Sequence, residues 1–165
     1  AVCKLYATVI RGTPMMVQML IMSMVIFANS RNFTMVGALA LGINSGAYVS
    51  EIIRGGLMAV DPGQMEAGRS LGLNYMTTMV LIVIPQAIRS VLPALGNEFV
   101  NMIKQASLGS IFFVNELTTA YRTASAATFL PIESLIISGV IYLFVTTLFT
   151  WVVQLAERRM AVSAA

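Results

Sequence analysis

Histidine is absent from the 165-residue sequence, and cysteine occurs once, as Cys3. Zinc sites are built mainly from these two residue types, and a Cys–His nucleophile pair needs both. An internal disulfide needs a second cysteine. These absences exclude the commonest metal site and the Cys–His nucleophile, and they disfavour a membrane-embedded enzyme.

Charge is also scarce, because charged residues make up only 10% of the chain while hydrophobic residues make up 58%. A soluble domain carries about 25% charged residues. The ten Lys and Arg residues form no basic run, so nucleic acid is not an expected partner. The composition predicts a multi-pass protein of the lipid bilayer, folded as a single all-α domain over residues 1–165.

Four stretches are hydrophobic enough to be membrane spans. The first is the shortest, because it covers only about 21 Å of a hydrocarbon core about 30 Å thick. Its helix is therefore expected to extend beyond the stretch at one end. The fourth carries no charged residue and has acidic or basic residues on both sides. The predicted spans are residues 15–28, 35–54, 86–105 and 134–156.

A polar interval at residues 61–85 separates the second span from the third. Asp61 is a predicted N-cap, followed by Pro62 at the first helical position and by Gln64 where a capping-box partner stands. Gly72 is a predicted left-handed C-cap. These signals predict a helix of about ten residues, and Asn74 is expected to cap a second short helix that ends before Pro85.

The same interval is too short and too charged to cross a bilayer, because it carries Glu66 and Arg69. It resembles the cytoplasmic loop of the permease subunits of ATP-binding-cassette importers, whose motif is E-A-A-x3-G-x9-I-x-L-P. The motif residues present are Glu66, Ala67, Gly72, Ile82 and Pro85, whereas Gly68 replaces the second alanine and Ile84 replaces the leucine.

Two further segments resemble the polar amino-acid branch of that family, the glutamine and histidine type. They are R-G-T-P at residues 11–14, ahead of the first span, and S-G-A-Y-V-S-E-I-I-R-G-G at residues 45–56. The resemblance implies a type I importer permease fold with five spans, so the chain is expected to lack the first one. It also implies uptake of a small polar amino acid by alternating access.

The resemblance implies several partners as well. They are cytoplasmic ATPase subunits, a second permease subunit that is identical or different, and an extracytoplasmic solute-binding protein. The family uses the loop as a coupling helix on the ATPase, so Ala67 and Gly68 are expected to allow close approach and Gly72 to turn the chain. The chain has no G-x4-G-K-[ST] phosphate loop, so ATP and Mg²⁺ are expected on the partner, with no cofactor in this chain.

Polar residues inside the spans are the candidates for a translocation path. Asn44, Tyr48 and Glu51 share one helical face, with Glu51 expected to pair with Arg54. Asn97, Asn101 and Lys104 share a face of the third span, and Glu98 is displaced from it by about 120° relative to Lys104. For both helices, packing against neighbours remains an alternative to lining a path.

The distribution of basic residues predicts the orientation through the positive-inside rule. With the loop in the cytoplasm, both chain ends are expected on the same side. The residues assigned to the inner side are Lys4, Arg11, Arg54, Arg69, Arg89, Arg158 and Arg159, against Arg31, Lys104 and Arg122 outside or within a span. A channel or secondary transporter without an ATPase is the alternative function.

Overall fold

The computed structural model describes residues 2–112 and 114–162, with the side chains of residues 159–162 left out. These residues form helices joined by short turns, and no strand occurs among them. Three helices have the length and apolar character of a membrane span: α3 (Phe33–Met58), the continuous helical segment Tyr75–Phe112, and α8 (Pro131–Val162). The all-α prediction is confirmed.

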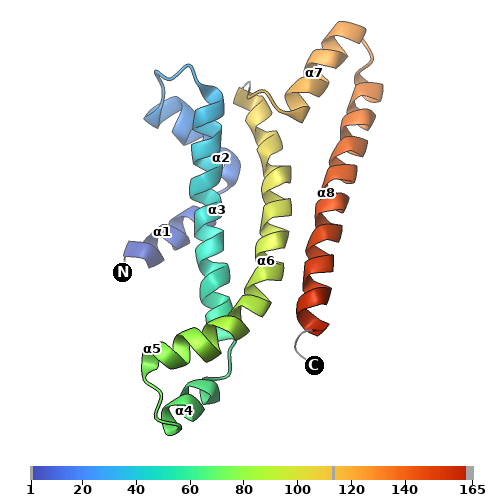
Figure 1. Ribbon diagram of the computed structural model, residues 1–165. Coiled ribbons are helices and arrows are strands. Elements are labelled where there is room, and N and C mark those ends of the chain that lie inside the picture. Colours follow the sequence, from blue (N-terminus) through green and yellow to red (C-terminus); the bar gives the residue numbers. More distant parts are fainter. Residues whose placement is uncertain (1, 113, 163–165) are drawn as a thin grey trace.

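Three long helices stand side by side and define the shape of the molecule (Figure 1). The helix α6 (Ile84–Gln105) lies between α3 and α8 and packs against both. A short 3-10 helix, η3 (Ala106–Phe112), continues α6. The helix α7 (Leu117–Thr128) then packs against α8. The segment between the third and fourth predicted spans therefore contains a short helix.

The opposite end of this layer carries the polar interval (Figure 1). It contains α4 (Pro62–Ser70) and α5 (Tyr75–Thr78), and α5 runs through a π-helical turn, η2 (Met79–Val83), directly into α6. The prediction that the second short helix ends before Pro85 is therefore wrong. Pro85 occupies the first turn of α6, where the wider π-turn before it accommodates a residue that lacks an N–H.

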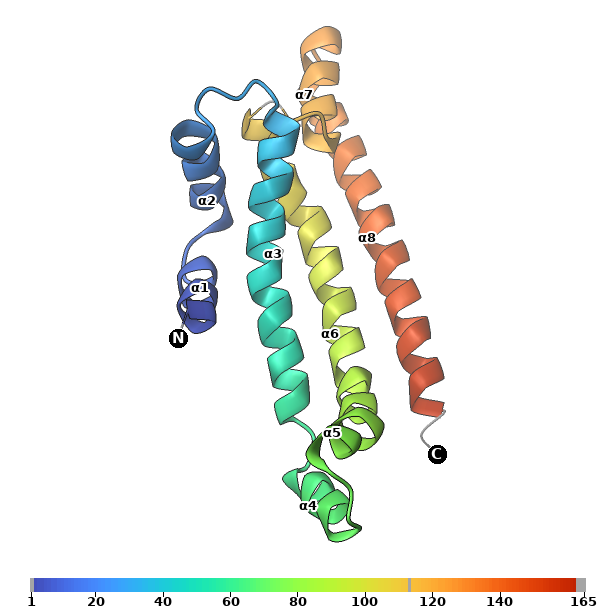
Figure 2. The ribbon, with the colours of Figure 1, turned by 60° about the vertical axis from the view of Figure 1, so that its left-hand side comes forward.

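The N-terminal part differs most from the prediction. Residues 15–28 do not form a span on their own, because α2 (Met15–Ile21) and its π-helical extension η1 (Met22–Ile26) are too short. They follow α1 (Val2–Arg11) after a 107° bend, and the bent pair together counts as a broken span. Figure 2 shows both pieces lying along α3.

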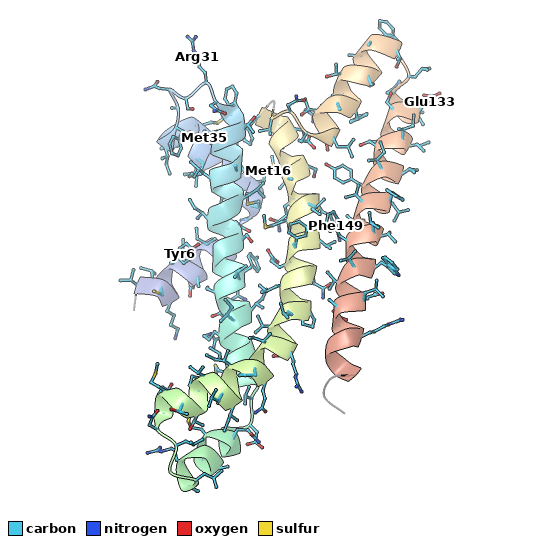
Figure 3. The ribbon with its side chains drawn as sticks, in the orientation of Figure 1. Tyr6, Met16, Arg31, Met35, Glu133 and Phe149 are labelled. Carbon is cyan, nitrogen blue, oxygen red and sulfur yellow. The ribbon has the colours of Figure 1, made fainter. Side chains whose placement is uncertain are left out.

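The helix α1 belongs to the packed part of the molecule. It lies beside α3, away from the α4 end (Figure 1). The Tyr6 hydroxyl donates to the Ile43 carbonyl oxygen at 2.5 Å. Lys4 and Arg11 line one cleft with Arg54, in the half of α3 that leads to the loop, so their assignment to the inner side stays a prediction. Arg31 does lie at the end opposite α4 (Figure 3).

Few residues are buried, and the main core cluster joins α2 to α3. It contains Met15, Met19 and Ala40, with partly buried residues of η1, α3 and η3 around it. By contrast, α8 leaves most of its large apolar side chains exposed. Such surfaces suit lipid or another subunit rather than water.

Candidate functional site

The polar interval folds as the helix caps predict at both ends of α4. The Asp61 carboxylate accepts from the Gly63 N–H at 2.8 Å, and Pro62 is in the first turn. At the other end Gly72 adopts a φ of +79°, and the N–H groups of Gly72 and Leu73 donate to the carbonyls of Arg69 and Gly68. This pair of bonds is a Schellman motif, so the predicted glycine C-cap is confirmed.

Gln64 has a different role from the predicted one. Its side-chain oxygen accepts a hydrogen bond from the Gln86 Nε2 at 3.2 Å, and its backbone N–H donates to the Asp61 carbonyl. The Gln64 side chain thus ties α4 to the first turn of α6 instead of completing a capping box. Asn74 caps α5 as predicted, because its Oδ1 accepts from the Thr77 N–H at 2.8 Å.

Gly68 lies on the inner face of the loop, against Thr78. A Cβ at position 68 would lie 2.5 Å from the Thr78 Cγ2 atom, which is closer than side chains approach, and both residues are buried. The element that approaches Gly68 closely is therefore α5 of the same chain. The expectation that Gly68 faces a partner is corrected, because α5 occupies that side of α4.

The outer face of the interval is open. Glu66 and Ala67 are exposed, as are Gly72 and Pro85, and Ile82 is half-buried. Around the turn between α4 and α5 three large apolar side chains also face outward: Leu71, Tyr75 and Met76 are 80%, 59% and 66% exposed. The motif does not include these three residues. They add to the exposed surface because the turn between α4 and α5 points their side chains outward. Together they give the water-exposed end of the layer an apolar patch.

The polar face of α3 packs against the bent N-terminal pair. The Asn44 amide donates to the Gln18 Oε1 at 3.0 Å, and Asn44 is buried. The Arg11 guanidinium lies 5.5 Å from the centre of the Tyr48 ring and 3.0 Å from a Glu51 carboxylate oxygen. In this conformation Asn44, Tyr48 and Glu51 pack against neighbouring helices, which is the alternative to lining a path.

Glu51 also pairs with Arg54, as predicted, through bonds of 2.6 and 2.8 Å. These residues border an open cleft of about 660 Å³ between α1 and α3, which Lys4 and Arg11 also line. The cleft brings the charges of two predicted segments, R-G-T-P and the second span, to one place.

Gln18 is the residue that holds this bend, and the sequence analysis did not assign it a role. Its amide donates to the Ile10 carbonyl at 2.6 Å, to the Thr13 carbonyl at 3.0 Å and to the Thr13 hydroxyl at 2.8 Å. With the bond from Asn44, it connects α1, the turn, α2 and α3. Its position as a lone amide in a hydrophobic stretch is the signal that could have identified it.

The polar residues of α6 do not form one group. Asn97 and Lys104 are exposed, and Asn101 is half-buried. Glu98 is buried instead. It lies two helical turns after Val91, which packs against Gly56 of α3. On the α8 side, Gly96 contacts Val153, and the Phe99 ring meets the Phe149 ring edge-on at 5.2 Å (Figure 3).

Comparison with known proteins gives a consistent picture. Residues 1–162 match the family described as "Binding-protein-dependent transport system inner membrane component". The nopaline transport permease NocM of Agrobacterium fabrum is 38% identical over 164 residues, covering 92% of this chain and 68% of the relative. The arginine permease ArtQ of Bacillus subtilis is 34% identical, covering 96% of this chain and 74% of the relative.

The glutamine permease GlnP of Escherichia coli is 34% identical over 165 residues, covering 98% of this chain and 75% of that protein. A solved structure titled "Crystal structure of an amino acid ABC transporter with histidines" superimposes with a TM-score of 0.89 at 43% identity. The matched region covers 94% of this chain and 74% of the chain in that structure.

Proposed function

The chain belongs to the family of binding-protein-dependent transport system inner membrane components, and from this premise we propose that it moves a polar amino acid across the cell membrane for an ATP-binding-cassette importer. Its relatives are permeases for nopaline, glutamine and arginine. Movement of the solute would proceed by alternating access, in which rigid helices shift between two packings.

The observation that carries the proposal is the loop at residues 61–85. It is capped at both ends, packed internally through Gly68 and Thr78, and exposed on its outer face at Glu66, Ala67 and Leu71. A rigid projection with an apolar exposed patch suits docking to a cytoplasmic subunit. Because α4 joins α3 and α5 runs into α6, movement of a docked partner would reach both spans directly.

The ATPase that docks there would bind ATP and Mg²⁺, since this chain lacks a phosphate loop. A second permease subunit is needed for a different reason. In the layer of α3, α6 and α8, Asn97 and Lys104 of α6 are exposed, and helical periodicity puts them on one face. A path along that face is enclosed only when another subunit covers it. The α7 end, opposite the loop, is where a solute-binding protein would deliver its ligand.

Within this proposal Asn97, Asn101 and Lys104 line the path, and Glu98 borders it from the α3 side. Asn44 and Tyr48 would act indirectly, by fixing the bent N-terminal pair against α3. A channel or secondary transporter is not favoured, because neither requires a structured docking loop or an ATPase partner.

Reconstitution tests the proposal. The chain is placed in liposomes with its ATPase, its second permease subunit and its binding protein, and accumulation of radiolabelled polar amino acids is measured with ATP or with a non-hydrolysable analogue. We expect accumulation only with hydrolysable ATP and binding protein. Absence of ATP-dependent uptake for every polar amino acid tested would overturn the substrate class, and uptake that persists without the ATPase would favour the alternative.

A further inference from the structure

The α1–α3 cleft, the open space of about 660 Å³ between these two helices, gathers three basic side chains around one acid. Lys4 and Arg11 line it from α1, and Arg54 lines it from α3 together with Glu51. Arg11 and Arg54 both pair with Glu51, whereas no ion pair of Lys4 is recorded among the residues that the structure describes. With three basic residues against one acidic residue, the lining of the cleft carries a net positive charge.

Hydrogen-bond donors remain in this cleft for a further anion. Arg54 donates from Nε and from one terminal nitrogen to the Glu51 carboxylate, at 2.6 and 2.8 Å. Its other terminal nitrogen meets the sulfur atom of Met58 at 2.9 Å, and sulfur is a weak acceptor. The Lys4 ammonium and the Thr8 side chain line the same space. A phosphate group suits this set, because guanidinium and ammonium groups form charge-assisted hydrogen bonds with its oxygens.

The cleft lies toward the end of α3 that leads to the loop. The helix has 26 residues, so at 1.5 Å per residue it is about 39 Å long, against a hydrocarbon core about 30 Å thick. Its ends therefore reach the headgroup regions of the bilayer. Arg54 is four residues before the last residue of α3, Met58. The basic side chains of the cleft are thus placed at the depth of lipid headgroups.

The helix α1 has the two faces of a helix that lies at a membrane surface. Lys4, Thr8 and Arg11 recur at i, i+4 and i+7, and all three line the cleft. Val2 and Leu5 are on another face and are 80% and 65% exposed. A helix that is basic on one face and apolar on another binds anionic lipids at the membrane surface. The apolar face beside the cleft favours a lipid over a soluble phosphate compound.

We propose that the α1–α3 cleft binds the phosphate group of an anionic phospholipid from the leaflet on the loop side of the membrane. Lys4, Arg11 and Arg54 would contact the phosphate oxygens, and an acyl chain would lie against exposed apolar side chains of α1 such as Leu5. A lipid bound there would hold the bent N-terminal pair against α3. The inference rests on the proposed function only where that leaflet is identified as the cytoplasmic one, whose negative surface attracts basic segments.

The test measures lipid binding to the purified importer complex. The complex in detergent is titrated with phosphatidylglycerol, which is anionic, or with phosphatidylcholine, which has no net charge, and native mass spectrometry measures how much of each lipid is retained. Lys4→Gln removes a basic residue of the cleft, and Glu51→Gln removes the acid that competes for Arg11 and Arg54. Arg31→Gln is the matched control, since it removes one positive charge from an exposed position at the opposite end of the molecule (Figure 3).

We expect the unmodified complex to bind phosphatidylglycerol more tightly than phosphatidylcholine. Lys4→Gln should weaken the binding of phosphatidylglycerol by about fivefold, the usual contribution of one basic residue near an anionic surface. Glu51→Gln should strengthen it, because the guanidinium groups of Arg11 and Arg54 are then available to the phosphate. Arg31→Gln should bind as the unmodified complex does. Loss of folding cannot produce these opposite effects of Lys4→Gln and Glu51→Gln.

Equal binding of the two lipids, an effect of Lys4→Gln no larger than that of Arg31→Gln, or weaker binding in Glu51→Gln would overturn the inference. Free glycerol phosphate, added at the concentration of the lipid, should not displace phosphatidylglycerol. If it does, the cleft is a site for a soluble phosphate compound and the lipid assignment is wrong. Because lipid binding is measured without transport, absence of amino-acid uptake would overturn the proposed function and leave the lipid site standing.

Discussion

Glu66 and Gly68 are two residues apart on α4, yet they face opposite ways. Glu66 is exposed to solvent, whereas Gly68 is buried against Thr78, whose hydroxyl is itself tied to the Asn74 carbonyl at 3.0 Å. A helix places residues two apart about 160° from each other around its axis, which explains the contrast. Glu66 is thus available to a partner, while Gly68 maintains the shape that presents it.

The first prediction concerns Glu66→Lys. Because the side chain is exposed and no described ion pair includes it, the substitution should leave the fold intact. Reversing the charge at a docking surface should lower ATP-dependent uptake by about tenfold or more. Uptake and transport-stimulated ATP hydrolysis are measured in the reconstituted complex, with thermal unfolding as the check on folding.

The control for that experiment is Glu133→Lys, which makes the same charge reversal on α8 at the opposite end of the layer (Figure 3). Its readout is co-purification of the ATPase subunit, which Glu133→Lys should leave unchanged because Glu133 lies far from the loop. If Glu66→Lys retains both full uptake and full stimulation of the ATPase, Glu66 has no coupling role.

At the scale of elements, the bend between α1 and α2 has the most consequences. It places α1 beside α3, brings Arg11 to Glu51 and Tyr48, and makes residues 15–28 part of a broken span. Backbone groups freed by such a break must find partners inside the membrane. The Gln18 amide satisfies the carbonyl groups of Ile10 and Thr13.

We therefore expect Gln18→Leu to lower the free energy of unfolding by about 1–3 kcal/mol, because it removes the partner of the buried Asn44 amide and of the partly buried bonds to the Ile10 and Thr13 carbonyl groups. Thermal unfolding of the purified complex and amide hydrogen exchange over residues 8–18 should both show the loss. Ser23→Ala is the control, since among the described residues the Ser23 hydroxyl bonds only to the Leu20 carbonyl of its own helical segment. Equal stability of the two variants would refute this role for Gln18.

At the scale of the whole molecule, α6 is the central helix of a single layer, with protein on two sides only (Figure 1). The exposed surface of α6 includes polar side chains such as Asn97 and Lys104, whereas the exposed side chains of α8 are mostly apolar, such as Val140, which is 59% exposed. Polar side chains at membrane depth are stable where they meet water or another subunit. The polar surface of α6 is therefore the one expected to face the path, and the apolar surface of α8 the one expected to face lipid.

Thiol labelling can test that separation. In a Cys3→Ser background, cysteines at Asn97, Lys104 and Val140 are treated in sealed vesicles with a membrane-impermeant maleimide, with and without ATP. Asn97→Cys and Lys104→Cys should react, at rates that change with ATP, while Val140→Cys should remain unlabelled. Labelling at Val140 equal to that at Asn97 would contradict a path along α6.

The sequence by itself determined the class of protein and the local form of its loop. Composition predicts the all-α membrane fold, and residues such as Asp61, Gly72 and Asn74 specify helix ends through bonds within a few positions of themselves. These interactions are local, so their spacing along the chain is sufficient to predict them.

Only the tertiary structure decided which side chains meet across helices. The burial of Glu98, the contact of Gly68 with Thr78 and the bonds of Gln18 depend on how α1, α3 and α6 are placed and rotated. Helical periodicity identifies residues that share a face but does not say what covers that face. Glu98 and Lys104 therefore look equivalent as intramembrane charges, and packing alone makes one buried and the other exposed.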